Sequence, residues 1–413
     1  MTSIETLGKS CCGCHGCEQI CPIGAIKFVE DTEGFVYPQV NESCIECGKC
    51  EAVCPIISGP RRYTADKGFA AFLKDKSALN RSSSGGVFAA AAKTILECGG
   101  MVIGCGEAVV GHPKHIVVTN EEDLKLLQGS KYVQSDISGM YTQIEDQLKT
   151  GRLVLFSGTP CQVAGLRKYV GEHDNLYTVD LICHGVPSRK MYKSYLKWLE
   201  KKTGAQVEHF RFRSKDKHDW SLTYQVLFRE GEKVKKQEKI ATLSPYYHQF
   251  LCGMTYRESC YTCGFACPER CGDLTIGDFW GIEQVMPEFY NLNGVSAVLV
   301  NSPQGCQLWS AMQEKLMTKE VPVHQIVAHN GQLNHPTKRP TERNAIYECL
   351  NQKGYDTVAK IFIDPKMKRI DTIKDFVPNR IRQTIKLALK SKNWWSNRES
   401  FCKFLCKEPD SVK

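Results

Sequence analysis

The feature that most constrains this chain is a repeated group of cysteines near its amino-terminal end. Cysteines stand at positions 11, 14, 17 and 21, with a proline after the last, and the same spacing returns 33 residues later at positions 44, 47, 50 and 54, again followed by proline. Thiols this dense are typical of metal ligands in a reducing compartment, whereas disulfide scaffolds belong to short secreted proteins. With 413 residues the chain can bury a core without disulfides. The repeat therefore predicts metal chemistry.

The spacing is that of bacterial two-cluster ferredoxins, in which three close thiolates and a proline-linked fourth from the other half hold each cubane. We therefore expect a ferredoxin-like domain over residues 1–60 that carries two 4Fe-4S clusters. The predicted ligand sets are Cys11, Cys14, Cys17 and Cys54, and Cys44, Cys47, Cys50 and Cys21. Zinc is the alternative, although zinc sites rarely repeat four close cysteines followed by proline. Cys12 fits neither set, and we interpret it as a spectator thiol.

The charge of the chain is unevenly distributed. Residues 1–59 hold eight acidic residues against three lysines, a net charge of −5, so the remainder carries +14 of a chain whose net charge is +9. Such a basic body either attracts an acidic redox partner or a phosphate-bearing cofactor, or carries ordinary solvated charge. We expect no nucleic-acid partner. Because no apolar signal segment or membrane-spanning stretch stands out, we expect a cytoplasmic protein.

After residue 60, short apolar strands alternate with amphipathic helices, which favours an α/β body. The pattern predicts, among other elements, a helix over Val87–Cys98, a hairpin around Gly231 and a helix over Cys306–Met317. The chain ends in a basic, partly amphipathic segment around Ile381–Leu389. That segment is either a peripheral membrane contact or a helix packed on the body with a basic tail.

Two loops have the composition of a cofactor site. Ser82–Gly86 places hydroxyls and glycines at the start of a predicted helix, where free amides and the helix dipole favour an anion such as a pyrophosphate. Gly129–Ser135 adds a cation, an aromatic ring and further hydroxyls. Either loop could also be a surface turn. Clusters deliver single electrons while most organic reductions need two, and a flavin converts between them.

A further group of cysteines, Cys260, Cys263, Cys267 and Cys271, could hold a third cubane or a zinc ion. Cys161 and Cys183 follow predicted strands, where α/β proteins place their sites. The ligand set is therefore either all local, or Cys260 and Cys263 completed by Cys161 and Cys183. His184 is a candidate proton donor to a reduced substrate, with a packing role as the alternative. We interpret the remaining thiols as buried structural cysteines: Cys98, Cys105, Cys252, Cys306, Cys349, Cys402 and Cys406.

Taken together, the segments SSSGG, GSKYVQS, SGTPCQ, CHGVPS and CYTC ending in DLTIGDFWG resemble the beta-subunit family of coenzyme F420 hydrogenases and dehydrogenases, over about residues 68–301. Members with a fused two-cluster ferredoxin head include relatives that reduce chlorophyll-type pigments. The resemblance implies a noncovalent FAD, held in part by Ser83, Ser84, Gly85, Gly86, Lys131, Tyr132 and Ser135. It also implies a 4Fe-4S cluster near the flavin. In the family, positions like Cys267 and Cys271 are usually not cysteine, which favours Cys161, Cys183, Cys260 and Cys263 as its ligands.

The sequence and the resemblance lead to an α+β or α/β chain in four parts. These are a ferredoxin-like domain (1–60), the amino-terminal part of a flavin-binding body (66–150), its carboxyl-terminal part with a third cluster (151–330), and a helical basic region (331–413). We expect an oxidoreductase that passes electrons between ferredoxin, or the deazaflavin coenzyme F420, and a small organic or glycan-related substrate. The alternative is an electron-transfer subunit that feeds a partner enzyme. The oligomeric state stays open.

Overall fold

The structure is a computed structural model that describes residues 3–217 and 220–361, together with residues 372, 375 and 377. The predicted basic segment around Ile381–Leu389 lies outside the described residues, as do Cys402 and Cys406.

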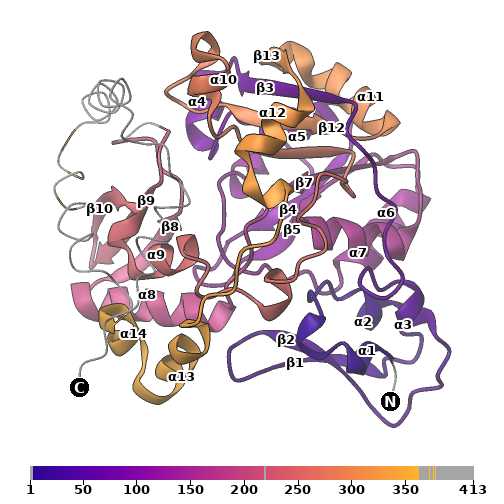
Figure 1. Cartoon of the computed structure of the whole chain (residues 1–413), viewed down its shortest axis with the longest axis horizontal. Coiled ribbons are helices and arrows are strands. Elements are labelled where there is room, and N and C mark those ends of the chain that lie inside the picture. Colours follow the sequence, from indigo (N-terminus) through magenta and orange to yellow (C-terminus); the bar gives the residue numbers. More distant parts are fainter. Residues whose placement is uncertain (1–2, 218–219, 362–371, 373–374, 376, 378–413) are drawn as a thin grey trace.

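The helices and strands form three neighbouring units (Figure 1). The α-helices are α1 (Ser3–Thr6), α2 (Gly16–Ile20), α3 (Lys49–Ala52), α4 (Lys76–Arg81), α5 (Val87–Glu97), α6 (Met140–Lys149), α7 (Pro160–Val170), α8 (Arg189–Thr203), α9 (Pro245–Leu251), α10 (Ile282–Val285), α11 (Pro303–Met312), α12 (Val323–His329), α13 (Arg343–Lys353) and α14 (Tyr355–Ile361). The strands are β1 (Ile26–Glu30), β2 (Val36–Val40), β3 (Lys67–Leu73), β4 (Met101–Gly106), β5 (Lys114–Val118), β6 (Val154–Gly158), β7 (Leu176–Leu181), β8 (Gln206–Arg211), β9 (Thr223–Glu230), β10 (Lys233–Ile240), β11 (Leu274–Asp278), β12 (Ser296–Val300) and β13 (Leu316–Val321). Two short 3-10 helices matter below: η2 (Glu122–Leu126) and η4 (Glu258–Cys260).

The amino-terminal module is small and built as a repeat. The helices α2 and α3 each begin inside one of the two cysteine groups, and the β1–β2 hairpin joins the halves in an antiparallel pair. Residues 33 positions apart in the two halves share an unusual backbone conformation, with positive φ. Gly13 and Glu46, which correspond, have φ of 71° and 51°, and the corresponding His15 and Gly48 have φ of 60° and 72°. Left-handed residues alternating with right-handed ones turn successive N–H groups into one concavity, a common setting for anions and iron-sulfur sites.

The largest unit is an eight-stranded mixed sheet with the order β13-β3-β12-β11-β7-β6-β4-β5. Its centre is parallel from β4 to β11, and the strands on either side are antiparallel. Alternate residues of these strands face opposite sides, so that α5 and α11 pack on one face and α6 and α7 on the other. The predicted α/β body is confirmed at this level. Strands from both predicted body segments, 66–150 and 151–330, share this one sheet.

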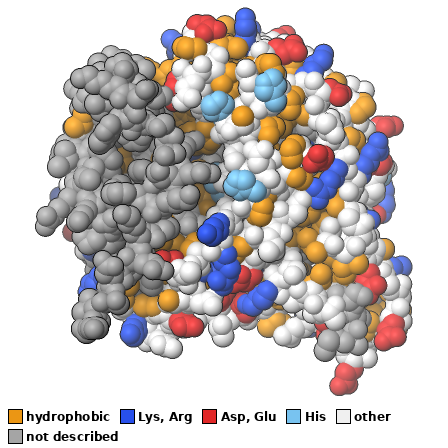
Figure 2. Space-filling view, in the orientation of Figure 1, with side chains coloured by type: hydrophobic (Ala, Val, Ile, Leu, Met, Phe, Trp, Pro, Cys, Tyr) orange, Lys and Arg blue, Asp and Glu red, His pale blue; other side chains and the backbone are white. Residues whose placement is uncertain are grey.

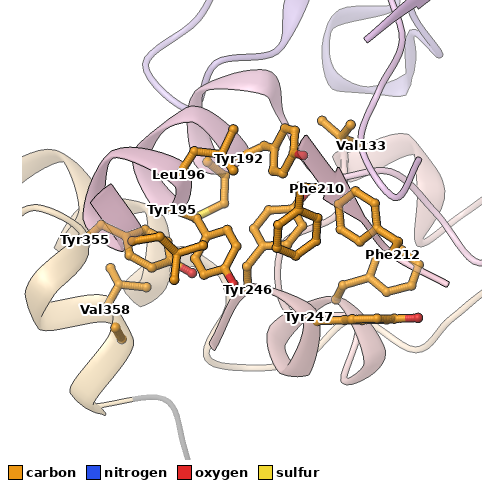
Figure 3. Close-up of a cluster of buried hydrophobic side chains, with 14 of the residues drawn as sticks. Val133, Tyr192, Tyr195, Leu196, Phe210, Phe212, Tyr246, Tyr247, Tyr355 and Val358 are labelled. Atoms are coloured by element: carbon orange, nitrogen blue, oxygen red, sulfur yellow. The ribbon is translucent and has the colours of Figure 1, made fainter. Parts of the chain in front are cut away.

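The third unit is an aromatic core beside the sheet. It joins α8, the antiparallel sheet β10-β9-β8, α9, α13 and α14. Tyr192, Tyr195, Phe210, Phe212 and Tyr246 interlock at its centre (Figure 3). Buried side chains of α13 and α14, from Ile346 to Ala359, therefore belong to the same core as α8 and the three-stranded sheet.

One element differs from its prediction. The helix expected over Cys306–Met317 begins earlier, because Ser302 caps it and Pro303 occupies its first turn, and it ends at Met312. Leu316–Val321 is instead an edge strand that pairs antiparallel with β3. The hairpin around Gly231 is present as β9 and β10, and the helix expected over Val87–Cys98 is α5. None of the helices in the described residues is long and apolar enough to cross a bilayer.

Candidate functional site

The first cysteine group is buried where the module meets the body. Cys11, Cys14, Cys17 and Cys54 are only 7–8% exposed. Burial raises the pKa of Cys17, and the thiolates of Cys11 and Cys54 raise it further, so these three sulfurs lie within electrostatic reach of one another. The Gly13 amide donates to Cys11 Sγ at 3.3 Å. The fold thus places Cys54 near Cys17 and Cys11 of the other half, and Cys50 also lies near Cys17. The division of these thiols into two ligand sets stays a prediction.

The second cysteine group lies at the surface. Cys21, Cys44 and Cys50 are partly buried, and Cys47 is exposed. The Ala25 amide donates to Cys21 Sγ at 3.2 Å. Burial raises the pKa of Cys50, with the thiolate of Cys44 among the further causes. Ile45, inside this group, is 62% exposed. Equal spacing in the sequence thus gives two groups that differ in access to solvent.

The third group converges from distant parts of the chain. Cys161 lies in the first turn of α7, which a capping box between Thr159 and Gln162 initiates, and Cys183 follows β7. Cys260 ends η4, and Cys263 comes three residues later. Burial raises the pKa of Cys183, and the thiolates of Cys260, Cys161 and Cys263 raise it further. Burial likewise raises the pKa of Cys260 to about 12 and that of Cys263 to about 11.

Cys267 and Cys271 have different surroundings. The Cys267 sulfur accepts a hydrogen bond of 2.7 Å from Arg62 Nη1, and Cys271 is buried beside Asp180 and Arg270. Neither lines the cavity that the other four cysteines line. The structure therefore gathers Cys161, Cys183, Cys260 and Cys263 rather than the all-local set.

Cys12, interpreted from its spacing as a spectator, lies between two of these groups. Its side chain shares hydrogen bonds with Cys14 of the first group and Cys161 of the third. The hydrogen bond with Cys12 is the largest influence on the pKa of Cys161 and raises it. Repeat spacing could not reveal this contact, since Cys161 comes from α7.

Other thiols depart from the predicted burial. Cys98 and Cys306 are exposed, and Cys105, Cys252 and Cys349 are only partly buried. Cys98 follows the last turn of α5 and Cys306 lies on α11, so both face outward from the sheet. The prediction of full burial is wrong for these five.

No group of three or more His, Cys, Asp or Glu side chains within the described residues could hold a metal ion. A tetrahedral zinc site needs four donors about 2.3 Å from one ion. In a cubane each thiolate binds a different iron, so the ligands stand further apart. The described thiols therefore form no ready-made zinc site.

A large cavity lies between the module, the mixed sheet and the aromatic core. Its volume is about 1730 Å³, whereas typical ligand pockets enclose about 300–1000 Å³. Cys12 and the four cysteines of the third group line it, and so do residues on both predicted cofactor loops. Figure 2 shows histidine and basic side chains along the middle of one face of the molecule. The cavity has room for a dinucleotide beside a cluster.

Some of the predicted cofactor-binding residues in the loop Ser82–Gly86 line the cavity, and one does not. Ser83, Ser84 and Gly86 line the cavity, and Ser83 Oγ accepts hydrogen bonds from the Ser130 amide at 2.7 Å and hydroxyl at 2.9 Å. Gly85 does not line it. A Cβ at Gly85 would stand 2.1 Å from the Ala71 carbonyl oxygen, so this glycine permits close packing on β3. The residue before α5 is its N-cap Gly86, with φ of 80°, and no side chain caps this helix.

The second loop contributes Lys131, Tyr132 and Ser135 to the wall. The Lys131 amine donates to three carbonyls at the end of η2, the shortest contact being 3.0 Å to Gln128. Burial lowers its pKa. The Tyr132 ring stacks on Phe250 at 4.4 Å.

Sequence reasoning missed a group of buried charges beside the serine loop. Arg213 pairs with Asp278 at 2.6 Å, and Trp220 Nε1 donates to Asp278 at 2.9 Å. Arg213 is 2% exposed, lines the cavity, and its Nε atom has no hydrogen-bond partner in the described structure. Lys215 donates to the carbonyls of Leu79 and Ser84, and burial lowers its pKa to about 7. Asp278 lies in the DLTIGDFWG motif, but Arg213 and Lys215 lie in no motif.

Two histidines differ in role. His184 is exposed on the cavity wall next to Cys183, and its carbonyl accepts a hydrogen bond from Thr337 at 3.0 Å. His115 on β5 is buried between the Ser157 carbonyl and the Ser135 hydroxyl, each 3.1 Å away. Burial lowers its pKa to about 4, so it is neutral near pH 7.

Residues 151–325 match the family model for the carboxyl-terminal part of the beta subunit of coenzyme F420 hydrogenase/dehydrogenase. The match covers less than half of the chain, and this segment is similar to that family. All four cysteines of the third group lie in it, whereas the loops Ser82–Gly86 and Gly129–Ser135 lie before it. No curated protein matches the chain. A chain of the F420-reducing NiFe hydrogenase complex from Methanosarcina barkeri is similar in structure, with a TM-score of 0.39 and 19% identity, over 73% of this chain and 92% of that chain.

Proposed function

We propose that the chain is a flavin- and iron-sulfur-dependent oxidoreductase of the F420 hydrogenase/dehydrogenase beta-subunit type. It passes electrons between ferredoxin, or the deazaflavin coenzyme F420, and a small organic or glycan-related substrate. The observation that carries the proposal is convergence on one cavity. Cys161, Cys183, Cys260 and Cys263 line the same space as Ser83, Ser84, Gly86, Lys131, Tyr132 and Ser135.

The described residues fit FAD and clusters in several ways. The amides at the start of α5 and the unpartnered Nε of Arg213 suit a phosphate group. The rings of Tyr132 and Phe250 offer an aromatic wall. When bound, the clusters would supply single-electron conduction and the flavin conversion between single electrons and pairs. We assign the 4Fe-4S ligands as the sets of the first, second and third cysteine groups.

The positions of the three groups suit two separate points of access, one for a protein electron carrier and one for the substrate. The second group faces solvent through Cys47, the first is buried against α7, and the third lies at the cavity with Cys12 between it and Cys14. An external protein carrier can therefore reach the second group, while the cavity serves the substrate. Electrons can pass either way along this order.

An ion pair and a hydrogen bond hold side chains of the cavity wall in place. Asp278 holds the buried guanidinium of Arg213, and neutral His115 fixes the Ser135 hydroxyl. His184, exposed beside Cys183, is the candidate proton donor at the cavity wall.

Anaerobic purification tests the proposal. Three cubanes predict about twelve iron atoms and twelve sulfides per chain, with one releasable FAD. About eight iron atoms would mean that the third group holds no cubane, and a colourless zinc protein without flavin would refute the redox function. Reoxidation of the reduced flavin by candidate substrates then separates an enzyme from an electron-transfer subunit, because a subunit alone would show no substrate-dependent reoxidation.

A further inference from the structure

Arg257 differs from the other buried arginines in its electrostatic partners. Five arginines of the described chain are at most 8% exposed. Four of them pair with a carboxylate: Arg167 with Asp273, Arg213 with Asp278, Arg270 with Asp180, and Arg343 with Glu33, at 2.6–2.8 Å. Arg257 is 0% exposed, and no carboxylate of the described residues lies within ion-pair distance of it. A buried cation without an anion is costly, so the missing counter-ion needs an explanation.

The contacts of Arg257 join the module to the body. Its Nε donates to the Cys11 carbonyl at 2.6 Å, Nη2 to the Val36 carbonyl at 2.9 Å, and Nη1 to Gln134 Oε1 at 3.2 Å. The guanidinium also lies over the Tyr37 ring, 4.2 Å from its centre. The three acceptors are neutral, so they leave the charge of the guanidinium uncompensated.

The backbone of the first and third groups lies against this charge. On the module side, Arg257 contacts the Cys11 carbonyl, and a Cβ at Gly13 would stand 3.1 Å from Arg257 Nη1. The backbone fixes this position, since the Arg257 amide donates to Val186 and its carbonyl accepts from the Cys260 amide, both at 2.9 Å. Arg257 is thus within electrostatic reach of the first and third groups at once.

We infer that Arg257 is a positioning residue whose charge is the shared counter-ion of the first and third thiolate sets and raises the reduction potentials of the clusters they hold. The inference rests on the proposed function. Reduction adds one electron to a cluster and breaks no bond, with reduced ferredoxin as the electron donor. A nearby buried cation favours the form with the added negative charge, because charges interact strongly in a low-dielectric interior.

The second group serves as an internal reference. Cys21, Cys44 and Cys50 are partly buried and Cys47 is exposed. Within the described residues, none of the hydrogen bonds of Arg257 reaches a cysteine of this group. Removal of the charge should therefore lower two potentials and leave the third unchanged.

Gln134 offers a way to neutralise the charge without removing the side chain. Its Oε1 already accepts from Arg257, so Gln134→Glu supplies a carboxylate of nearly the same shape. Arg343 offers a matched control. It is also 0% exposed and also ties the body to the module, through Glu33, but its partners are carboxylates and the Tyr256 carbonyl.

The test is an anaerobic redox titration of the full holoprotein followed by electron paramagnetic resonance. Arg257→Gln should lower the midpoints of two cluster signals, each at least tenfold in equilibrium constant, or about 59 mV for a one-electron couple. Arg257→Lys should retain most of the wild-type values. Gln134→Glu should shift the same two signals in the same direction, and it decides the question if Arg257→Gln does not fold. Arg343→Gln should leave all midpoints unchanged.

Each contrary outcome has its own meaning. A wild-type protein without reducible cluster signals would refute the proposed function. Wild-type signals that neither Arg257→Gln nor Gln134→Glu moves would refute only the role of Arg257. Equal shifts of all three signals, or the same shifts in Arg343→Gln, would show a general loosening of the module and would also overturn the inference.

Discussion

The two halves of the cysteine repeat share one spacing and differ in their surroundings. Cys14 of the first half packs against Gly165 of α7, where a Cβ would come within 3.1 Å of its sulfur. Its counterpart Cys47 is exposed in a loop of mostly exposed residues. Local spacing sets the shape of each half, and packing on the body decides which one is sealed from water. Under the proposed function, the exposed half would be the outer contact and the buried half the inner link.

Replacement of one ligand in each half tests this difference most strongly. Cys14→Ser and Cys47→Ser should each lose about four iron atoms, since each removes a cubane ligand. Cys14→Ser should also lower the free energy of unfolding by about 1–3 kcal/mol more, because it places a more polar hydroxyl at a buried position, whereas Cys47 is exposed. Iron counts and denaturant unfolding measure both effects. Equal destabilisation would show that burial does not distinguish the halves.

Acid should lower the stability of the protein through His115, a buried residue of β5. The folded-state pKa of buried His115 is about 4, below its unfolded value of about 6.5. The stability that neutral His115 contributes is therefore present above pH 6.5 and lost as the pH falls toward 4, by about 3 kcal/mol in all. His115→Gln should flatten this part of the stability curve between pH 7 and 4. A curve unchanged by the substitution would contradict the prediction.

A methyl group added at Gly165 should disturb only the half of the repeat that contains Cys14. A Cβ there would stand 2.8 Å from the Tyr141 hydroxyl and 2.9 Å from Cys14 Cβ. Gly165→Ala should cost about 1–3 kcal/mol through overpacking and alter the spectrum of the first cluster. Gly331→Ala is the control, since open space surrounds that position and its backbone is unstrained. Thermal unfolding of the two variants compares them.

The smallest effect belongs to a surface ion pair of the module. Lys9 pairs with Asp31, and the Lys9 side chain is 54% exposed. Lys9→Met should cost less than about 1 kcal/mol, and high salt should erase the difference from wild type because exposed charges are screened. A larger or salt-independent loss of stability would contradict the prediction that this pair behaves as an exposed ion pair.

The sequence predicted those parts of the molecule in which neighbouring residues act together. The two cysteine halves, the helix α5 and the β9–β10 hairpin follow from local spacing and turn chemistry. The choice between Cys161 and Cys271 for the third group needed the chain's topology, because α7 and η4 meet only in the folded protein. The resemblance favoured the set that the fold brings together.

The buried charges show what pattern alone could not supply. Arg213 and Arg257 stand in segments without a motif, and each gains its significance from a partner far away in sequence, Asp278 or Cys11. Leu316–Val321 is similar, since pairing with β3 rather than its own composition makes it a strand. Gly85 shows the opposite: it lies in a loop whose pattern predicts ligand binding. Its position is set instead by close contact with β3.

The strand order of the mixed sheet bears on how this protein can be divided. The family match starts just before β6 and ends after β13, yet β6 is hydrogen-bonded to β4, and β12 and β13 are hydrogen-bonded to β3. A fragment cut at residues 151 and 325 would lose both neighbours and present unpaired strand edges to other copies of itself, a common start of aggregation. A fragment that keeps all strands of the family match paired must therefore also include β3 and β4.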